Sequence, residues 1–157
     1  MAINYEKIDT DARGKALVAA TGHGDTDSLT EANARAAEQA VCVLKLREAF
    51  FNEHATSVNP NGADPSASTF ASQRDALATS IAEAEAARDR IVAATGADVS
   101  GVMAPILAAN RTKAEQDHFD ADWKAVNVPG LSQAELDECQ LICDRAEREV
   151  AVIEGWT

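Results

Sequence analysis

The chain has 157 residues and a formal net charge of −12, because 26 Asp and Glu residues outnumber 14 Lys and Arg residues. Hydrophobic residues make up 46% of it and there are only 8 Gly and 4 Pro, which excludes collagen-like and low-complexity classes and leaves enough apolar surface for a packed core. The negative charge disfavours binding to a nucleic-acid backbone, since no cluster of basic residues offsets the repulsion.

The composition favours helices over strands. Aromatic residues make up only 4% of the chain, whereas alanine, the strongest helix former, is abundant; strands prefer aromatic and β-branched residues. We therefore predict an all-α fold, an antiparallel bundle of about four to five helices in a single helical domain over residues 1–157. A short N-terminal helix is expected at about 9–21, because Gly22 stands where a helix commonly ends, and the main bundle over about 28–155.

The main bundle is expected to begin with a long helix. Ser28 and Glu31 have the spacing of a capping box, in which each side chain accepts a hydrogen bond from a backbone N–H group at the start of the helix. Apolar residues at intervals of three and four carry this helix to about His54. The stretch at about 55–64 is rich in turn-forming residues and poor in apolar ones, so it is expected to be an exposed loop between two long helices.

The next helix is predicted to follow Asp64, which can cap it, with Pro65 at the first helical position and Gly96 at the end. Arg74 and Arg88 share the apolar side of this helix, and they would either pair with carboxylates on a neighbouring helix or contact another subunit. The apolar residues of that side recur every seven positions, at Phe70, Leu77, Ala84 and Ile91.

A fourth helix is expected to start anew near Pro105, which cannot donate a backbone hydrogen bond. It should run to about Val126, before Val128, Pro129 and Gly130 break the chain. The stripe predicted to face the core consists of Ile106, Leu107, Ala114, His118, Phe119, Ala121 and Trp123.

The last helix has the clearest pattern. Ser132 and Glu135 form a second capping box, which predicts where the helix begins. Its seam has the alternating intervals of three and four that are typical of coiled coils, at Leu136, Cys139, Cys143, Ala146, Val150 and Ile153. The opposite face is expected to be solvated and acidic, with Asp137, Glu138, Asp144, Glu147 and Glu149.

Glu115 and His118 are the candidate metal ligands. Their E-x-x-H spacing places both side chains on one helix face, as in di-iron carboxylate bundles. Such a centre also needs a second E-x-x-H pair, and neither His23 nor His54 has a Glu three residues before it. We therefore expect no cofactor, and we keep a ferritin-like, metal-binding bundle as an alternative.

Three cysteines, Cys42, Cys139 and Cys143, are an odd number in a chain large enough to fold without disulfides. We expect them to serve as compact core residues, the alternative for Cys139 and Cys143 being a soft metal or a bond to another chain. Neither a signal peptide nor a run of about eighteen apolar residues is recognisable. The expected location is therefore the cytoplasm, or a virus particle if the chain is viral.

The expected function is non-enzymatic assembly. Long helices with heptad spacing and the lack of a recognisable catalytic set favour a structural protein that self-associates or docks to a larger complex. One version is a bacteriophage virion component, such as a connector, neck or capsid-associated protein. Its partners would be proteins, in a homo-oligomer or a larger assembly, with no membrane and no specific nucleic-acid sequence among them. The residues expected at an interface are Arg74, Arg88, Cys139, Cys143, Val150 and Ile153.

Two alternatives belong to other functional classes. The metal-binding bundle would be centred on Glu115 and His118. An acidic regulator that mimics nucleic acid would instead use its negative surface to bind a basic protein.

Overall fold

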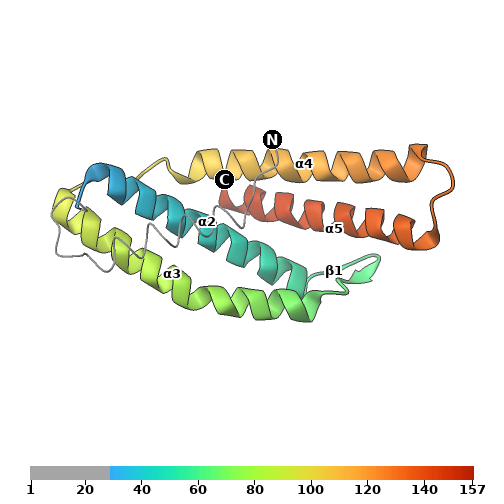
Figure 1. Cartoon of the computed structure of the whole chain (residues 1–157), viewed down its shortest axis with the longest axis horizontal. Coiled ribbons are helices and arrows are strands. Elements are labelled where there is room, and N and C mark those ends of the chain that lie inside the picture. The colour runs from blue at the N-terminus through green and yellow to red at the C-terminus, as the bar shows by residue number, and fades with distance from the viewer. Residues whose placement is uncertain (1–28) are drawn as a thin grey trace. The chain divides into compact units, whose positions relative to one another are not determined.

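The computed structural model describes residues 29–157, which are 81% helical, as predicted for an all-α fold (Figure 1). The helix expected at about 9–21 lies outside the described residues. The elements in chain order are α2 (Glu31–Thr56), β1 (Val58–Asn59), β2 (Gly62–Ala63), α3 (Ala67–Thr95), α4 (Met103–Asn127) and α5 (Gln133–Trp156). None of the helices formed by residues 29–157 combines the length and the apolar character needed to cross a bilayer.

The chain is organised in two compact units. Within the described residues, the α2–α3 unit consists of 29–48 and 72–106, and the α4–α5 unit consists of 49–71 and 107–157. Helices α2, α3 and α4 contribute to both units. The single helical domain expected over the whole chain stays a prediction.

Helix α2 begins at Glu31, later than the predicted cap at Ser28 would place it. The Oγ1 atom of Thr30 accepts a hydrogen bond from the Asn33 amide at 3.1 Å, so Thr30 caps the helix. The predicted cap at Ser28 itself lies outside the described residues.

The core of the α2–α3 unit combines alanines with large aliphatic side chains, among them Val41, Leu44 and Leu46. Ion and hydrogen-bond pairs show that the helices are antiparallel: Arg35 Nη1 donates to the Asp98 carbonyl at 2.9 Å, and Lys45 Nζ lies 3.5 Å from Glu85. Alanines let the two helices approach closely. The buried cluster contains Ala34, Ala37, Ala87, Ile91 and Ala97.

The predicted apolar side and end of α3 are confirmed, but the helix begins at Ala67 and Pro65, expected at its first position, lies in the preceding turn. Leu77, Ile81, Ala84 and Ile91 are buried on one side, and the helix ends at Thr95. The next residue, Gly96, has a φ of 65°, a left-handed conformation that glycine adopts without strain.

In the α4–α5 unit, two antiparallel helices pack along their length (Figure 1). Helix α4 begins at Met103, with Pro105 in its first turn, which confirms the predicted new start. The capping box of α5 is also confirmed, since Ser132 Oγ accepts from the Glu135 amide at 3.2 Å and Glu135 Oε2 accepts from the Ser132 amide at 2.8 Å. The buried residues shared between the helices are Ala121, Cys139 and Cys143, with Ala125 and Ile142 packed against them.

The expectation of an exposed loop at about 55–64 needs correction. Strands β1 and β2 pair antiparallel, with Val58 opposite Ala63 and Asn59 opposite Gly62. Asp64, at the end of this hairpin, is only 4% exposed. The segment packs against α5 because its polar side chains Asn59 and Asp64 form hydrogen bonds with Arg145 and Arg148. Local composition does not indicate this contact.

The stripe predicted for α4 was partly wrong. Leu107, Ala114 and Ala121 are buried as expected, but the side chains of Phe119 and Trp123 are 62% and 54% exposed. A helix turns by 100° per residue, so Phe119 and Trp123 lie on a different face from Ala114 and Ala121. The predicted stripe therefore combines residues from two different sides of the helix.

Replacing Ile91 with alanine tests the core of the α2–α3 unit. Because Ile91 is completely buried, the cavity left behind should lower the free energy of unfolding by about 2–5 kcal/mol. Urea denaturation followed by circular dichroism measures it. The control Val126→Ala, at a side chain 76% exposed, should change stability by less than about 0.5 kcal/mol, and equal effects of the two changes would contradict the assignment of the core.

Candidate functional site

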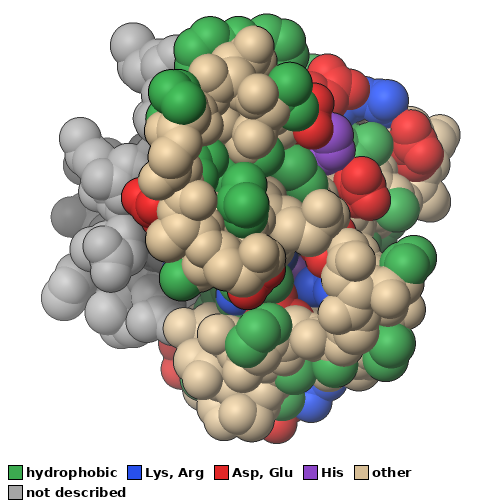
Figure 2. All heavy atoms as spheres, turned by 90° about the vertical axis from the view of Figure 1, so that its right-hand side faces the viewer, with side chains coloured by type: hydrophobic (Ala, Val, Ile, Leu, Met, Phe, Trp, Pro, Cys, Tyr) green, Lys and Arg blue, Asp and Glu red, His purple; other side chains and the backbone are tan. Residues whose placement is uncertain are grey.

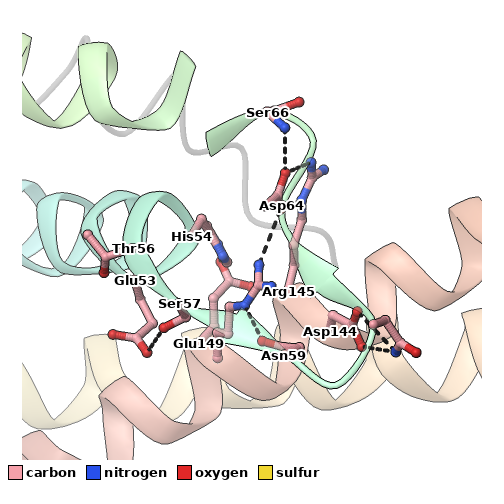
Figure 3. Close-up of polar contacts among 12 residues, drawn as sticks. Glu53, His54, Thr56, Ser57, Asn59, Asp64, Ser66, Asp144, Arg145 and Glu149 are labelled. Carbon is pink, nitrogen blue, oxygen red and sulfur yellow. Dashed lines mark hydrogen bonds and ion pairs between the residues drawn. The ribbon is translucent and has the colours of Figure 1, made fainter. Parts of the chain in front are cut away.

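A cluster of buried charges connects the β-hairpin to α5 (Figure 3). Asp64 Oδ2 accepts from Arg145 Nε at 2.8 Å and from Arg148 Nη1 at 3.2 Å, and Asp64 Oδ1 accepts from Arg145 Nη2 at 2.9 Å. Arg148 Nε also donates to Asn59 Oδ1 at 2.8 Å. One carboxylate from the hairpin thus holds two guanidinium groups from successive turns of α5. We call Asp64, Arg145, Arg148 and Asn59 the hairpin lock.

Asp64 has a second structural role. Its Oδ1 atom accepts from the Ser66 amide at 2.8 Å, which satisfies one of the exposed N–H groups at the start of α3 and confirms the predicted cap. Burial by itself would raise the pKa of Asp64. The hydrogen bonds from Arg145 and Ser66 and the charges of both arginines outweigh burial and lower this pKa from 3.8 to about 2.

Aromatic rings lie beside the lock. The Arg145 guanidinium lies 5.0 Å from the centre of the Phe70 ring, a cation–π distance. The His54 ring lies 4.9 Å from the same ring, with its Nε2 atom 3.9 Å from Glu149 Oε1. His54 Nδ1 is buried and has no hydrogen-bond partner within residues 29–157.

The face of α5 expected to be solvated is partly buried. Asp144 is only 6% exposed; it accepts from Gln140 Nε2 at 2.9 Å and lies 3.4 Å from Asn61 Nδ2. The prediction for Asp144 was wrong because the hairpin covers this side of the helix. An open pocket of about 630 Å³ lies here, between the hairpin and the first turns of α5, with Asp64, Asp144 and Arg148 in its wall. The hairpin lock already uses Asp64 and Arg148, which favours a structural role for these charges.

The other surface feature of this unit is an apolar face on α4. The side chains of Phe119, Trp123 and Val126 are 62%, 54% and 76% exposed. Their spacing of four and three residues puts them on one side of the helix. We call these three residues the α4 apolar face.

A groove between α4 and α5 adjoins this face at Phe119 and has a volume of about 360 Å³. We call it the α4/α5 groove. Its apolar lining comes from Ala114, Phe119, Ala146, Val150 and Ala151, and its acidic lining from Glu115, Asp122, Glu147 and Glu154. Figure 2 shows acidic side chains beside hydrophobic ones on the face that it draws.

Glu115 and His118, the candidate metal ligands, both line the groove but bond to other residues. Glu115 Oε1 accepts from Arg111 Nε at 2.8 Å, and His118 Nε2 lies 3.1 Å from Glu147 Oε1. Among the described residues no group of three or more His, Cys, Asp or Glu side chains could hold a metal ion.

The residues expected at an interface lie in different surroundings. Arg88 Nη1 donates to Glu38 Oε2 at 2.9 Å inside the α2–α3 unit, the first of the two roles considered for it. Arg74 Nε donates to its neighbour Asp75 at 3.0 Å. Cys139, Cys143 and Ile153 are buried, while Val150 is half-buried and lines the groove. Their contact with another subunit stays a prediction.

Sequence reasoning missed the hairpin lock and the α4 apolar face. A signal for the lock is present: Leu141, Arg145, Arg148 and Val152 have intervals of four, three and four, a second stripe beside the seam of α5. Charged residues in such a stripe indicate buried ion pairs. The partner Asp64 could not be found in this way, because it is 81 residues from Arg145 in the sequence.

We expect Asp64→Asn to lower the free energy of unfolding by about 3 kcal/mol at pH 7, because two guanidinium groups lose their carboxylate. The pKa of Asp64 is lower in the folded chain, so its contribution is complete above the unfolded value and is lost as the pH falls through the folded value. The wild type should therefore lose about 2 kcal/mol more than the variant between pH 5 and pH 2.

Urea denaturation at a series of pH values measures both effects. The matched control is Asp120→Asn, on an exposed position of α4, which should keep both the stability at pH 7 and the wild-type pH dependence. Parallel curves for the wild type and Asp64→Asn would contradict the lowered pKa of Asp64, because they would show that protonation of this carboxylate does not change the free energy of unfolding.

The thiols should be unreactive in the folded chain. Burial and the adjacent Glu38 carboxylate raise the pKa of Cys42 to about 12, and burial followed by the charges of Asp122 and Glu147 raises the pKa of Cys143. A thiol-specific chromogenic reagent at pH 8 should label none of the three cysteines within minutes, and all three after unfolding in urea. Rapid labelling of the folded chain would contradict the packing of α4 against α5 or the burial of Cys42.

Comparisons with known proteins give no information on the function of this chain. No known protein family, curated protein or solved structure matches this chain. The function is therefore argued from the surface of the α4–α5 unit itself.

Proposed function

We propose that this chain is a non-enzymatic assembly protein that acts by protein contact through the α4 apolar face and the adjoining α4/α5 groove. The observation that carries the proposal is the exposure of Phe119, Trp123 and Val126 on one side of a single helix. Neighbouring exposed apolar side chains of this size commonly mark interaction sites, because water contact with them is unfavourable and a partner relieves it.

Two further observations support a contact role for this surface. The groove continues the apolar surface from Phe119 to Val150 and Ala151, which extends the area that a partner would cover. Trp is also a residue on which binding energy commonly concentrates, and Phe is enriched in protein interfaces. The contact is either self-association or docking to a larger complex, and a component of a bacteriophage particle is one setting for such a role.

The double variant Phe119→Ser, Trp123→Ser tests the surface. Both side chains are more than half exposed, so their loss should change the free energy of unfolding by less than about 1 kcal/mol. Light scattering on a sizing column, at two protein and two salt concentrations, measures the mass. If the chain self-associates, the wild-type mass should rise with protein concentration at high salt, where repulsion between chains of charge −12 is screened, and the variant should keep the mass of one chain.

The control variant Gln116→Ser, Lys124→Ser changes two exposed polar positions of the same helix and should behave as the wild type. Association that persists in the Phe119 and Trp123 variant would contradict the proposal. A wild type that keeps the mass of one chain in all four conditions would exclude self-association and leave docking to a different protein, which the peptide experiment below tests.

A further inference from the structure

The charge of the α4/α5 groove restricts which partner can occupy it. Four carboxylates line it, those of Glu115, Asp122, Glu147 and Glu154. Arg111 bonds to two of them, with Nε 2.8 Å from Glu115 Oε1 and Nη2 3.1 Å from Glu154 Oε1. Four carboxylates beside one guanidinium leave an excess of three negative charges when His118 is neutral.

The shape of the apolar surface restricts the partner further. Ala114, Ala146 and Ala151 are small, so large side chains of a partner have room between the two helices. Phe119, Trp123 and Val126 continue this surface along α4 at intervals of four and three residues. A helix with apolar residues at the same spacing would match this arrangement, as in other complexes where an amphipathic helix lies in a groove.

A second copy of the chain is a poor occupant on electrostatic grounds. The chain carries a formal charge of −12, and in a two-fold dimer each groove would meet the same acidic residues of the other subunit. Like charges brought together in this way oppose association.

We infer that the α4/α5 groove and the α4 apolar face bind a positively charged amphipathic helix of another protein, with its apolar side against Phe119 and Trp123 and its Lys or Arg residues beside Asp122 and Glu147. This inference rests on the proposed function, because it names the partner of the same surface. Charge complementarity supplies the specificity for a basic helix, and burial of the apolar side supplies affinity.

A titration of the full chain with designed peptides tests the inference. The probe is a helical peptide of roughly 18 residues, with leucines at intervals of three and four and lysines elsewhere. The comparison peptides are one with the same composition in scrambled order and one with glutamates in place of the lysines. The chain contains two Trp residues, so the variant Trp156→Phe leaves Trp123 as the only fluorescent reporter of the α4 apolar face.

The expected result is saturable binding of one lysine peptide per chain, with a shift of Trp123 emission to shorter wavelength and much weaker binding of the scrambled and acidic peptides. Asp122→Asn with Glu147→Gln should raise the dissociation constant roughly threefold or more at low salt. The matched control, Glu83→Gln with Asp120→Asn, removes the same charge at exposed positions that do not line the groove and should leave the dissociation constant within about twofold.

Other outcomes separate the inference from the proposed function. Equal weakening by the two double variants, or equal binding of the scrambled peptide, would show that only the overall charge is sensed and would overturn the inference. Stronger binding of the acidic peptide, or a dimer that Phe119→Ser, Trp123→Ser dissolves, would overturn the basic partner and leave the contact surface supported. No peptide binding, together with a wild type that stays a single chain, would overturn both.

Discussion

The α4–α5 unit depends on one buried ion cluster. Asp64 holds Arg145 and Arg148 on α5 and also caps α3 through the Ser66 amide. Burial of the Asp64 carboxylate without these partners would be strongly unfavourable. The hairpin is therefore stable in this position only when α5 supplies the two arginines. The short strands of the hairpin could not hold this position by their own pairing, since two-residue strands offer very few hydrogen bonds.

This arrangement divides the surface of α5 into two sides with different roles. One side packs against α4 through Cys139, Cys143 and Ala146. The other side meets the hairpin through Arg145 and Arg148. Among residues 29–157, no comparable segment covers α4 on the side of Phe119 and Trp123, whose side chains are more than half exposed. The unit thus pairs Asp64 with two arginines while Phe119 and Trp123 stay exposed, and this exposure is the physical basis of the proposed docking role.

How much could be predicted from the sequence depended on how local each signal was. Caps and turn glycines act within a few residues, so the start of α5 at Ser132 and the end of α3 before Gly96 were predicted correctly. The seam of α5 was also recognised from its spacing, and Cys139, Cys143, Ala146 and Ile153 are buried. Helix class and the approximate bounds of the helices within residues 29–157 followed from such signals.

The candidate site could not be predicted in the same way. The hairpin lock joins residues more than 80 positions apart, and only the tertiary fold brings them together. The faces of α4 were misassigned because apolar residues at 114, 119, 121 and 123 cover more than one side of the helix, and spacing alone does not say which side meets α5. Glu115 and His118 do share a face, but the fold supplies an arginine and a second carboxylate as their neighbours.

Three helices are continuous across the boundary between the two compact units, which affects proteolysis and unfolding. Helices α2, α3 and α4 each pass from one compact unit into the other without leaving helical geometry. Within residues 29–157 the boundary therefore runs through hydrogen-bonded backbone, where a protease finds no extended segment to cleave. Neither unit can be released as an independent fragment by a cut at the boundary. Local opening in one unit can also fray a helix that continues into the other, so the opening of the two units is coupled through the chain.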